Sequence, residues 1–248
     1  MGAIYKKILL NLFLLFISAG VFLSCGIDEY YYLNPVQSGD IQLTLQERAV
    51  IHLPGVSASY FTHFTIFYRI YISDYSAPGT IQTSSAVLSS INSTLASDYA
   101  AIEPSTSITS TTSNTTNTSS LFRNRNYQIL NYEGHDVISS QNTSLILDFP
   151  IGSNPSVTVN GNTWNLYRST GNGSFTPVPN RYFRNTDELN SSANAISTVN
   201  GDVVNKSSLS GKRYTYTAMY IVVTGLDQQS YTPIYSIPAF IGIFRLPD

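Results

Sequence analysis

The strongest pattern in the chain is an alternation of apolar and polar residues between residues 60 and 73. One side of this alternation is apolar and consists of Tyr60, Phe64, Ile66, Tyr68, Ile70 and Ile72. The other side includes His63, Thr65, Arg69 and Ser73. A period of two is that of a β-strand, because successive side chains point to opposite faces of a sheet. The pattern therefore predicts a half-buried strand with one solvent-facing side, which is typical of antiparallel sheets.

A second alternating segment, near the C-terminus, predicts the partner of this strand. Apolar residues recur at every second position from Tyr214 to Val222, and a turn follows at Gly225-Leu226-Asp227. The chain then returns through residues 234–244, where both faces are apolar. Pro238 in the returning segment implies a β-bulge or an edge position, because proline has no N–H group to donate to a neighbouring strand.

Shorter segments extend the all-β pattern. Further strands are predicted at residues 41–43, 49–53, 127–132 and 144–149. Pro54-Gly55 ends the second of these, because both residues interrupt regular structure. Between residues 157 and 164, Asn160-Gly161 separates two alternating segments, which is a strong signal for a β-hairpin. Val157, Val159 and Trp164 are expected to line that hairpin.

The middle of the chain interrupts this pattern with one helical segment. Its apolar residues Val87, Leu88, Ile91, Leu95 and Tyr99 recur at helical spacing. Ser84 and Ser85 precede them as capping residues and Pro104 follows, so that one amphipathic helix packed against the sheet is predicted. Residues 105–120 are almost entirely Ser and Thr and have no charged side chain, a composition that predicts a mobile surface loop.

Two early strands, a strong central strand and a closing pair resemble the fibronectin type III and immunoglobulin-like β-sandwiches. In this resemblance residues 49–53 are the second strand, residues 64–72 the third, and the closing pair the last two. It implies an all-β antiparallel sandwich over residues 40–248, with a helix and long loops inserted at about residues 75–140. A core tryptophan on the early strands is absent.

The first 25 residues have the three parts of an export signal. Lys6 and Lys7 supply positive charge, residues 8–23 are mostly apolar, and Ser24 stands directly before Cys25. Sixteen helical residues at 1.5 Å each span only about 24 Å, which is short for a bilayer core of about 30 Å. A permanent transmembrane helix is therefore disfavoured.

The ending Phe22-Leu23-Ser24-Cys25 resembles the lipobox of bacterial lipoproteins, in the loose form of spirochaetes. The resemblance implies that residues 1–24 are a signal peptide and that residues 25–39 form a lipidated tether. Cys25 would carry a thioether-linked diacylglycerol and an amide-linked acyl chain such as palmitate. Ordinary cleavage that leaves a free thiol, or an uncleaved anchor, are the alternatives. Gly26, in place of Asp, resembles outer-membrane or surface lipoproteins.

Charge and cysteine content narrow the class of partners. The chain has 13 Lys and Arg against 15 Asp and Glu, and loss of Lys6 and Lys7 with the signal leaves 11 against 15, a net charge of about −4. Nucleic-acid binding is disfavoured, because it needs a basic stripe. Cys25 is the only cysteine, so no disulfide is available to the folded part.

Few residues suggest catalysis. The histidines are His52, His63 and His135, and none is spaced as a metal-binding pair. His135 stands beside Glu133 and Asp136, where a carboxylate could orient an imidazole, although a polar turn explains this cluster better. No cofactor or metal site and no enzymatic activity are therefore predicted.

These observations favour a cell-envelope lipoprotein, anchored to the outer membrane or cell surface through Cys25, that carries a non-catalytic binding or structural module. One alternative is a surface adhesin that recognises host protein or glycan through the Ser/Thr-rich loop and exposed tyrosines. Another is a lipid-anchored hydrolase centred on Glu133, His135 and Asp136. Phe61, Phe67 and Tyr71 on the polar side of the central strand are either a binding surface or, in the favoured interpretation, covered by the helix.

Overall fold

The structure is a computed structural model of the whole chain. It describes residues 33–44, 47–55, 60–76, 85–103, 120–132, 144–150, 152–168, 183, 202–204, 209–227 and 231–247. The chain divides into two units, Met1–Tyr31 and Tyr32–Asp248, and every described residue belongs to the second unit. Cys25, the cluster at residues 133–136 and nearly all of the Ser/Thr-rich segment lie outside the described residues.

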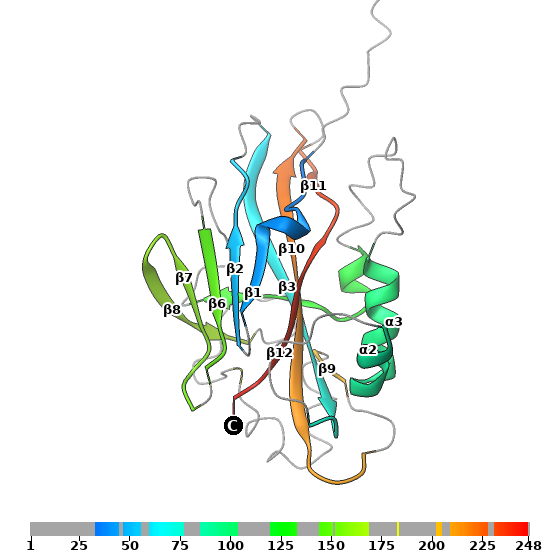
Figure 1. Cartoon of the computed structure of the whole chain (residues 1–248). Helices are drawn as coiled ribbons and strands as arrows, with labels where there is room; N and C mark the ends of the chain where they lie inside the picture. The colour runs from blue at the N-terminus through cyan, green and yellow to red at the C-terminus, as the bar shows by residue number, and fades with distance from the viewer. Residues whose placement is uncertain are drawn as a thin grey trace, which may run out of the picture. The chain divides into compact units, whose positions relative to one another are not determined.

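Two long antiparallel strands form the centre of the fold. β3 (Phe61–Ser73) pairs with β10 (Tyr214–Leu226) along its whole length, from Ser73 opposite Tyr214 to Phe61 opposite Gly225 (Figure 1). This confirms the pairing predicted from the two alternating segments. The remaining strands of the same sheet are shorter, and each pairs with only a part of this ribbon.

Four shorter strands complete the first sheet. β11 (Pro233–Tyr235) and β12 (Ala239–Arg245) both pair antiparallel with β10, whereas β4 (Gln128–Ile129) and β9 (Val203–Val204) pair with β3, β9 in parallel. The register between β10 and β12 shifts at Met219 and Tyr220. On β12 the shift lies between Phe240 and Gly242, shortly after Pro238, at which a bulge or an edge position was predicted.

In the described residues, the second sheet contains six antiparallel strands in the order β1-β2-β6-β7-β8-β5. Their bounds are β1 (Ile41–Thr44), β2 (Arg48–His52), β5 (Asn131–Tyr132), β6 (Ser144–Asp148), β7 (Ser156–Val159) and β8 (Asn162–Tyr167). A short 3-10 helix, η1 (Ser38–Asp40), precedes β1. The predicted hairpin is confirmed as β7–β8, and Asn160 and Gly161 have φ of 48° and 80°, as a tight hairpin turn requires. The fold class is therefore all-β and mainly antiparallel, with few helices.

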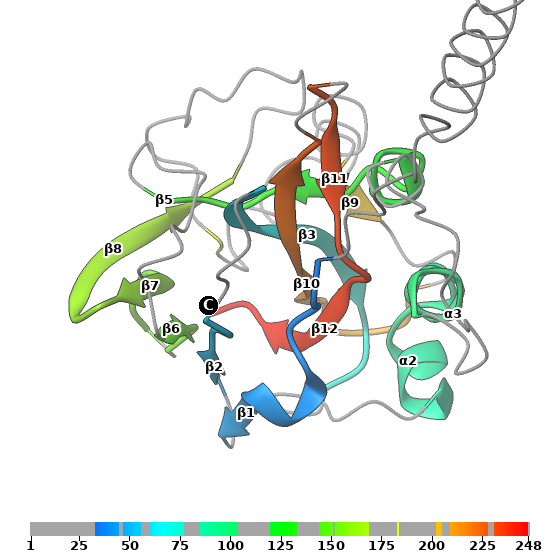
Figure 2. The ribbon, with the colours of Figure 1, turned by 90° about the horizontal axis from the view of Figure 1, so that it is seen from above.

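Aromatic rings from both sheets meet in the core. Phe149, which follows β6, stacks on Phe244 of β12 with ring centroids 4.7 Å apart. Phe183 packs edge-on against Tyr68 of β3 at 4.8 Å and is also in contact with Phe149. All four side chains are buried. Figure 2 looks along the strands and shows β2 and β6 on one side, with β3, β10 and β12 on the other.

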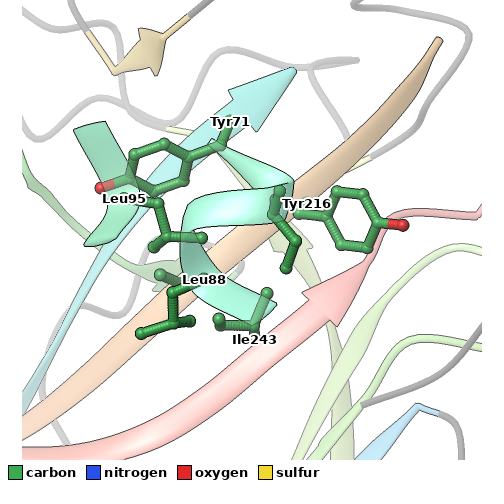
Figure 3. Packing of buried hydrophobic residues seen from close by; sticks show 7 residues of the cluster. Tyr71, Leu88, Leu95, Tyr216 and Ile243 are labelled. Carbon is green, nitrogen blue, oxygen red and sulfur yellow. The ribbon is translucent and has the colours of Figure 1, made fainter. Parts of the chain in front are cut away.

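In the described part of the chain, two helices and a helical turn at residues 120–123 cover the outer face of the β3–β10 ribbon. α2 (Ser85–Ile91) and α3 (Ser93–Ile102) supply Leu88, Ile91 and Leu95, which are buried against Tyr71, Tyr216, Ala218 and Ile243 (Figure 3). Further along this face, Phe67 stacks on Phe122 at 4.2 Å. The predicted helical cover is confirmed, but the predicted solvent-facing side of β3 is wrong, because from Phe64 onward this strand is buried on both faces.

The predicted single helix is in fact two helices that meet at Asn92. Asn92 is extended, with φ −162° and ψ 128°, and its side-chain oxygen accepts a hydrogen bond from the backbone N–H of Thr94 at 2.9 Å. Its Nδ2 donates to the carbonyl of Ile72 in β3 at 3.3 Å. The side chain therefore begins α3 as an N-cap and joins it to the sheet.

Residues between Leu33 and Asp40 already pack against the strands. Leu33 and Val36 are both buried, at 4% and 3% exposure. Leu33 lies against Gly225 of β10, since a Cβ added there would come within 3.1 Å of Leu33 Cδ1 and 2.7 Å of the Tyr60 carbonyl oxygen. The Leu226 N–H donates to that carbonyl at 2.8 Å. A glycine at position 225 permits this close approach.

Candidate functional site

Two groups of buried, charged side chains lie on opposite faces of β3. Arg69 and Tyr71 point to the helix-covered face, and Tyr68 points into the core between the sheets, because neighbouring side chains alternate along a strand. Each face brings one carboxylate to these residues, Asp98 on the helix side and Asp202 on the core side. These groups are the main concentration of charge in the described core.

On the helix side, Asp98 is the centre of what we call the Asp98 cluster: Arg69, Tyr71, Asp98, Arg125 and Tyr127. Arg69 Nη1 and the Tyr71 hydroxyl both donate to Asp98 Oδ2, at 2.6 Å and 2.7 Å. Arg125 Nε lies 3.7 Å from Asp98 Oδ1, and the Tyr71 and Tyr127 hydroxyls are 3.0 Å apart. The carboxylate thus joins α3 to β3 and to the segment that precedes β4.

The position of Asp98 follows from the geometry of α3. Leu95, Asp98 and Ile102 are the buried residues of this helix, and the spacing of three and four places them on one face. Leu95 and Ile102 bury apolar side chains against the sheet, which brings the carboxylate between them to Arg69. Burial of a carboxylate requires such a partner, because an unpaired buried charge is strongly destabilising.

The tyrosines around this cluster are held neutral. Burial raises the pKa of Tyr71 and of Tyr127 well above the ordinary value of 10.0, and the nearby charge of Asp98 raises both further. Burial also raises the pKa of Tyr220, whose hydroxyl has no hydrogen-bond partner in the described part of the chain. A phenol that stays protonated can donate a hydrogen bond but cannot act as a base near neutral pH.

These raised pKa values predict a loss of stability in alkaline solution. Unfolded tyrosines ionise near pH 10, whereas the buried ones resist ionisation until the protein unfolds. Their contribution is therefore complete below about pH 10 and is lost as the pH rises above that value towards the folded pKa. Urea unfolding, followed together with phenolate absorbance, should give midpoints that fall over this range.

Tyr220→Phe is a suitable control for this prediction. It removes a hydroxyl that finds no partner among the described residues, so stability at neutral pH is expected to stay the same or rise. The alkaline decline should become shallower, because one fewer buried phenol has to ionise. Ordinary titration of all the tyrosines while the protein remains folded would contradict the assignment.

On the core side, Arg168 and Asp202 form a second ion pair. Arg168 Nη2 donates to Asp202 Oδ1 at 2.9 Å and Nε donates to Oδ2 at 3.1 Å, with side-chain exposures of 4% and 0%. The Tyr68 hydroxyl donates to Oδ2 at 3.2 Å, and the Asp202 carbonyl accepts from the N–H of Ile70 at 2.7 Å. This pair joins the end of β8 to the start of β9 and to β3.

Both clusters have the character of structural crosslinks. Both carboxylates are buried and accept hydrogen bonds from arginine and tyrosine donors. In the described ranges no group of three or more His, Cys, Asp or Glu side chains is arranged to hold a metal ion. The arrangement joins α3, β8 and β9 to β3.

Two of the three histidines lie in the described residues, on different sheets. His52 is exposed at the end of β2, and His63 is half-buried near the start of β3 with Nδ1 2.9 Å from Thr62 Oγ1. Glu133, His135 and Asp136, the candidate hydrolase cluster, lie outside the described residues, as does the lipid-attachment residue Cys25.

The aromatic surface expected on β3 is largely covered. Phe67 and Tyr71 are buried under the helical layer, at 7% and 0% exposure, as the favoured interpretation predicted. The large hydrophobic side chain that is exposed in the described residues is Tyr231, at 76%. It has a positive φ of 54° in the turn between β10 and β11. No periodic pattern marks this position, so the sequence alone does not predict its exposure.

No helix in the described ranges is long and apolar enough to cross a bilayer. Comparison with protein-family models, curated proteins and solved structures finds no match for this chain. The function proposed below is therefore supported by this chain's own sequence and geometry.

Proposed function

We propose that the protein is a bacterial cell-envelope lipoprotein, anchored by acylated Cys25 and carrying an extracytoplasmic, non-catalytic binding or structural module. The observation that carries this proposal is the N-terminal segment: Lys6 and Lys7, an apolar stretch over residues 8–23, and Ser24 before the only cysteine of the chain. Gly26 favours the outer membrane or the cell surface as its location.

The short sequence separation between Cys25 and the folded unit supports an anchor. Eight residues after Cys25, the chain reaches Leu33, which is already buried in the packed unit. A cysteine between an apolar export segment and a folded domain is where a lipid anchor would be useful. Three acyl chains at about 0.8 kcal/mol per buried methylene exceed the two signals that stable membrane attachment requires.

The described interior supports a structural or binding role better than catalysis. Its carboxylates at positions 98 and 202 serve arginines and tyrosines that hold layers of the fold together. The ion pairs Arg69–Asp98 and Arg168–Asp202 therefore have a stabilising role. A rigid module of this kind suits recognition of a protein or glycan ligand, or a structural task in the envelope.

We further propose that the fold is a fibronectin type III or immunoglobulin-like sandwich with additions. The pairing β1-β2-β6 corresponds to strands A, B and E of that topology, and β3, β10 and β11–β12 correspond to C, F and G, with β4 as an added C′-type strand. The hairpin β7–β8 and strand β5 would then be additions that extend the A-B-E sheet, and the two helices an addition on the face of the other.

Fatty-acid labelling of the full-length chain in a bacterial host tests the proposed anchor. Wild-type protein grown with an alkyne analogue of palmitate should acquire the label and remain with the membranes, because Cys25 is acylated. Cys25→Ala should lose the label entirely, since no other thiol is present. Ser24→Ala is the matched control, because it keeps a small residue before the cysteine and should retain the label.

Two outcomes would overturn the proposal. One is wild-type protein that is exported but carries no fatty acid. The N-terminal segment would then be either an ordinary cleaved signal peptide or an uncleaved anchor. The other is undiminished labelling of Cys25→Ala, which would place the acyl chains elsewhere.

A further inference from the structure

At one end of the packed unit lie both Leu33, where the described chain begins, and the exposed Tyr231. We call it the entry end and define it by Leu33, Tyr60, Leu226 and Tyr231. Leu33 and Tyr60 both approach Gly225, the Leu226 N–H donates to the Tyr60 carbonyl at 2.8 Å, and Tyr231 follows in the turn to β11. Figure 1 shows β11 and the start of β3 at this end of the ribbon.

The length of chain after Cys25 limits how far this end can be from an anchored lipid. Eight residues separate Cys25 from Leu33, so that even a fully extended chain spans no more than about 28 Å. β3 has 13 residues, which at about 3.3 Å each place the opposite end of the ribbon roughly 43 Å away. Of the two ends, the entry end is therefore the one that the tether keeps near the membrane.

The backbone around Tyr231 holds this side chain outward. The Tyr231 N–H donates to the Asp227 carbonyl at 2.8 Å, and the Asp227 N–H donates to the Thr232 carbonyl at 2.9 Å. These bonds close the turn with Tyr231 at a positive φ of 54° and 76% exposed. A positive φ is unfavourable for tyrosine, so a turn that keeps an exposed ring in this conformation suggests that the ring has a use.

Charge distinguishes the entry end from the opposite end of the ribbon. Among the described residues next to this end, which are 53–55, 60–62, 226–227 and 231–235, Asp227 is the only Asp, Glu, Lys or Arg. At the opposite end, Arg245 lies 4.4 Å and Lys212 5.5 Å from the ring of Tyr214, and Arg213 is exposed, so that three basic side chains outnumber Asp74, the one nearby carboxylate in the described part of the chain. A weakly charged end with an exposed tyrosine matches the lipid headgroup layer, where tyrosine is enriched.

We propose that the entry end rests on the surface of the bilayer that holds Cys25, with the Tyr231 ring among the lipid headgroups. This inference depends on the proposed lipid anchor, which supplies the attachment that a single tyrosine cannot. The turn would fix the orientation of the module and direct the basic end around Tyr214 away from the membrane. The partner is the lipid surface itself rather than a second protein.

Tryptophan quenching by lipids tests this orientation. Tyr231→Trp and the matched control Tyr214→Trp are each made with Trp164→Phe, which removes the only native tryptophan. The acylated proteins, with acylation checked by mass, are placed in phosphatidylcholine vesicles with or without a spin-labelled headgroup. The Tyr231→Trp indole should lose fluorescence to the spin label and shift its emission to shorter wavelength, whereas the Tyr214→Trp indole should do neither.

The possible outcomes distinguish a failure of the proposed orientation from a failure of the proposed lipid anchor. Retention on vesicles with no quenching of the Tyr231→Trp indole, or with stronger quenching of the Tyr214→Trp indole, would overturn the orientation while the anchor stands. Protein that lacks acyl mass and fails to bind vesicles would instead contradict the proposed function. If Trp164→Phe fails to fold, the same comparison is made with Trp164 retained, as the difference between each variant and the wild type.

Discussion

Replacement of Asp202 by alanine is expected to lower the free energy of unfolding by about 3–5 kcal/mol. The substitution leaves the Arg168 guanidinium without its bidentate partner in a site where its side chain is 4% exposed. It also removes the oxygen to which the Tyr68 hydroxyl donates. Because 1 kcal/mol shifts the unfolding temperature of a domain of this size by roughly 2–4 °C, a decrease of about 10 °C should be visible by circular dichroism.

A double substitution distinguishes the cost of an orphaned charge from the loss of a favourable pair. Arg168→Met combined with Asp202→Leu removes both charges and should recover much of the lost stability, because apolar residues often replace buried ion pairs without cost. Arg168→Lys should recover little, since an ammonium cannot reproduce the two parallel hydrogen bonds. An Asp202→Ala variant as stable as the wild type would show that the pair does not hold β8 and β9 to β3.

Replacement of Asp98 by alanine is expected to destabilise the protein by about 3 kcal/mol, because it leaves the buried Arg69 side chain unpaired. Tyr71 loses its acceptor at the same time. Asp98→Asn should cost less, because the amide oxygen can still accept from Tyr71 although the negative charge is gone. Urea unfolding at neutral pH, followed by circular dichroism, measures these differences.

The control for Asp98 is Glu103→Ala. Glu103 stands at the end of the same helix and is exposed, so its removal should change the unfolding free energy by no more than about 0.5 kcal/mol. If Asp98→Ala costs no more than this control, the Asp98 cluster does not hold the helical layer to the sheet.

The strands were predictable because periodicity reports local geometry. Apolar residues recur at nearly every second position from Tyr60 to Ile72 and from Tyr214 to Val222, and the structure pairs these two segments as β3 and β10. Asn160-Gly161 also predicted its hairpin, because a tight turn needs residues that tolerate positive φ. The parallel two-residue strand β9 had no signal of its own, since Val203 and Val204 are too short a run to show a period.

The errors came from interactions between residues distant in the sequence. A charged Arg69 in the sequence predicts that its side of β3 faces solvent. In the structure Arg69 is buried, and its charge is balanced by Asp98 of α3, which is 29 residues away in the sequence. Asn92 fits a continuous helix by spacing, but in the structure its side chain caps α3 and also donates to the carbonyl of Ile72, which is 20 residues away in the sequence. Asp202 and Tyr231 stand outside any motif. The burial of Asp202 and the exposure of Tyr231 follow from tertiary packing, and no local sequence pattern predicts them.

The most direct test of the account is the intact mass of the protein extracted from bacterial membranes, with fragmentation of its N-terminal peptide. The account predicts a chain that begins at Cys25, with the mass of residues 25–248 increased by a diacylglycerol on the sulfur and one acyl chain on the α-amino group. A chain that begins at another residue, or one with an unmodified Cys25 thiol, would contradict it.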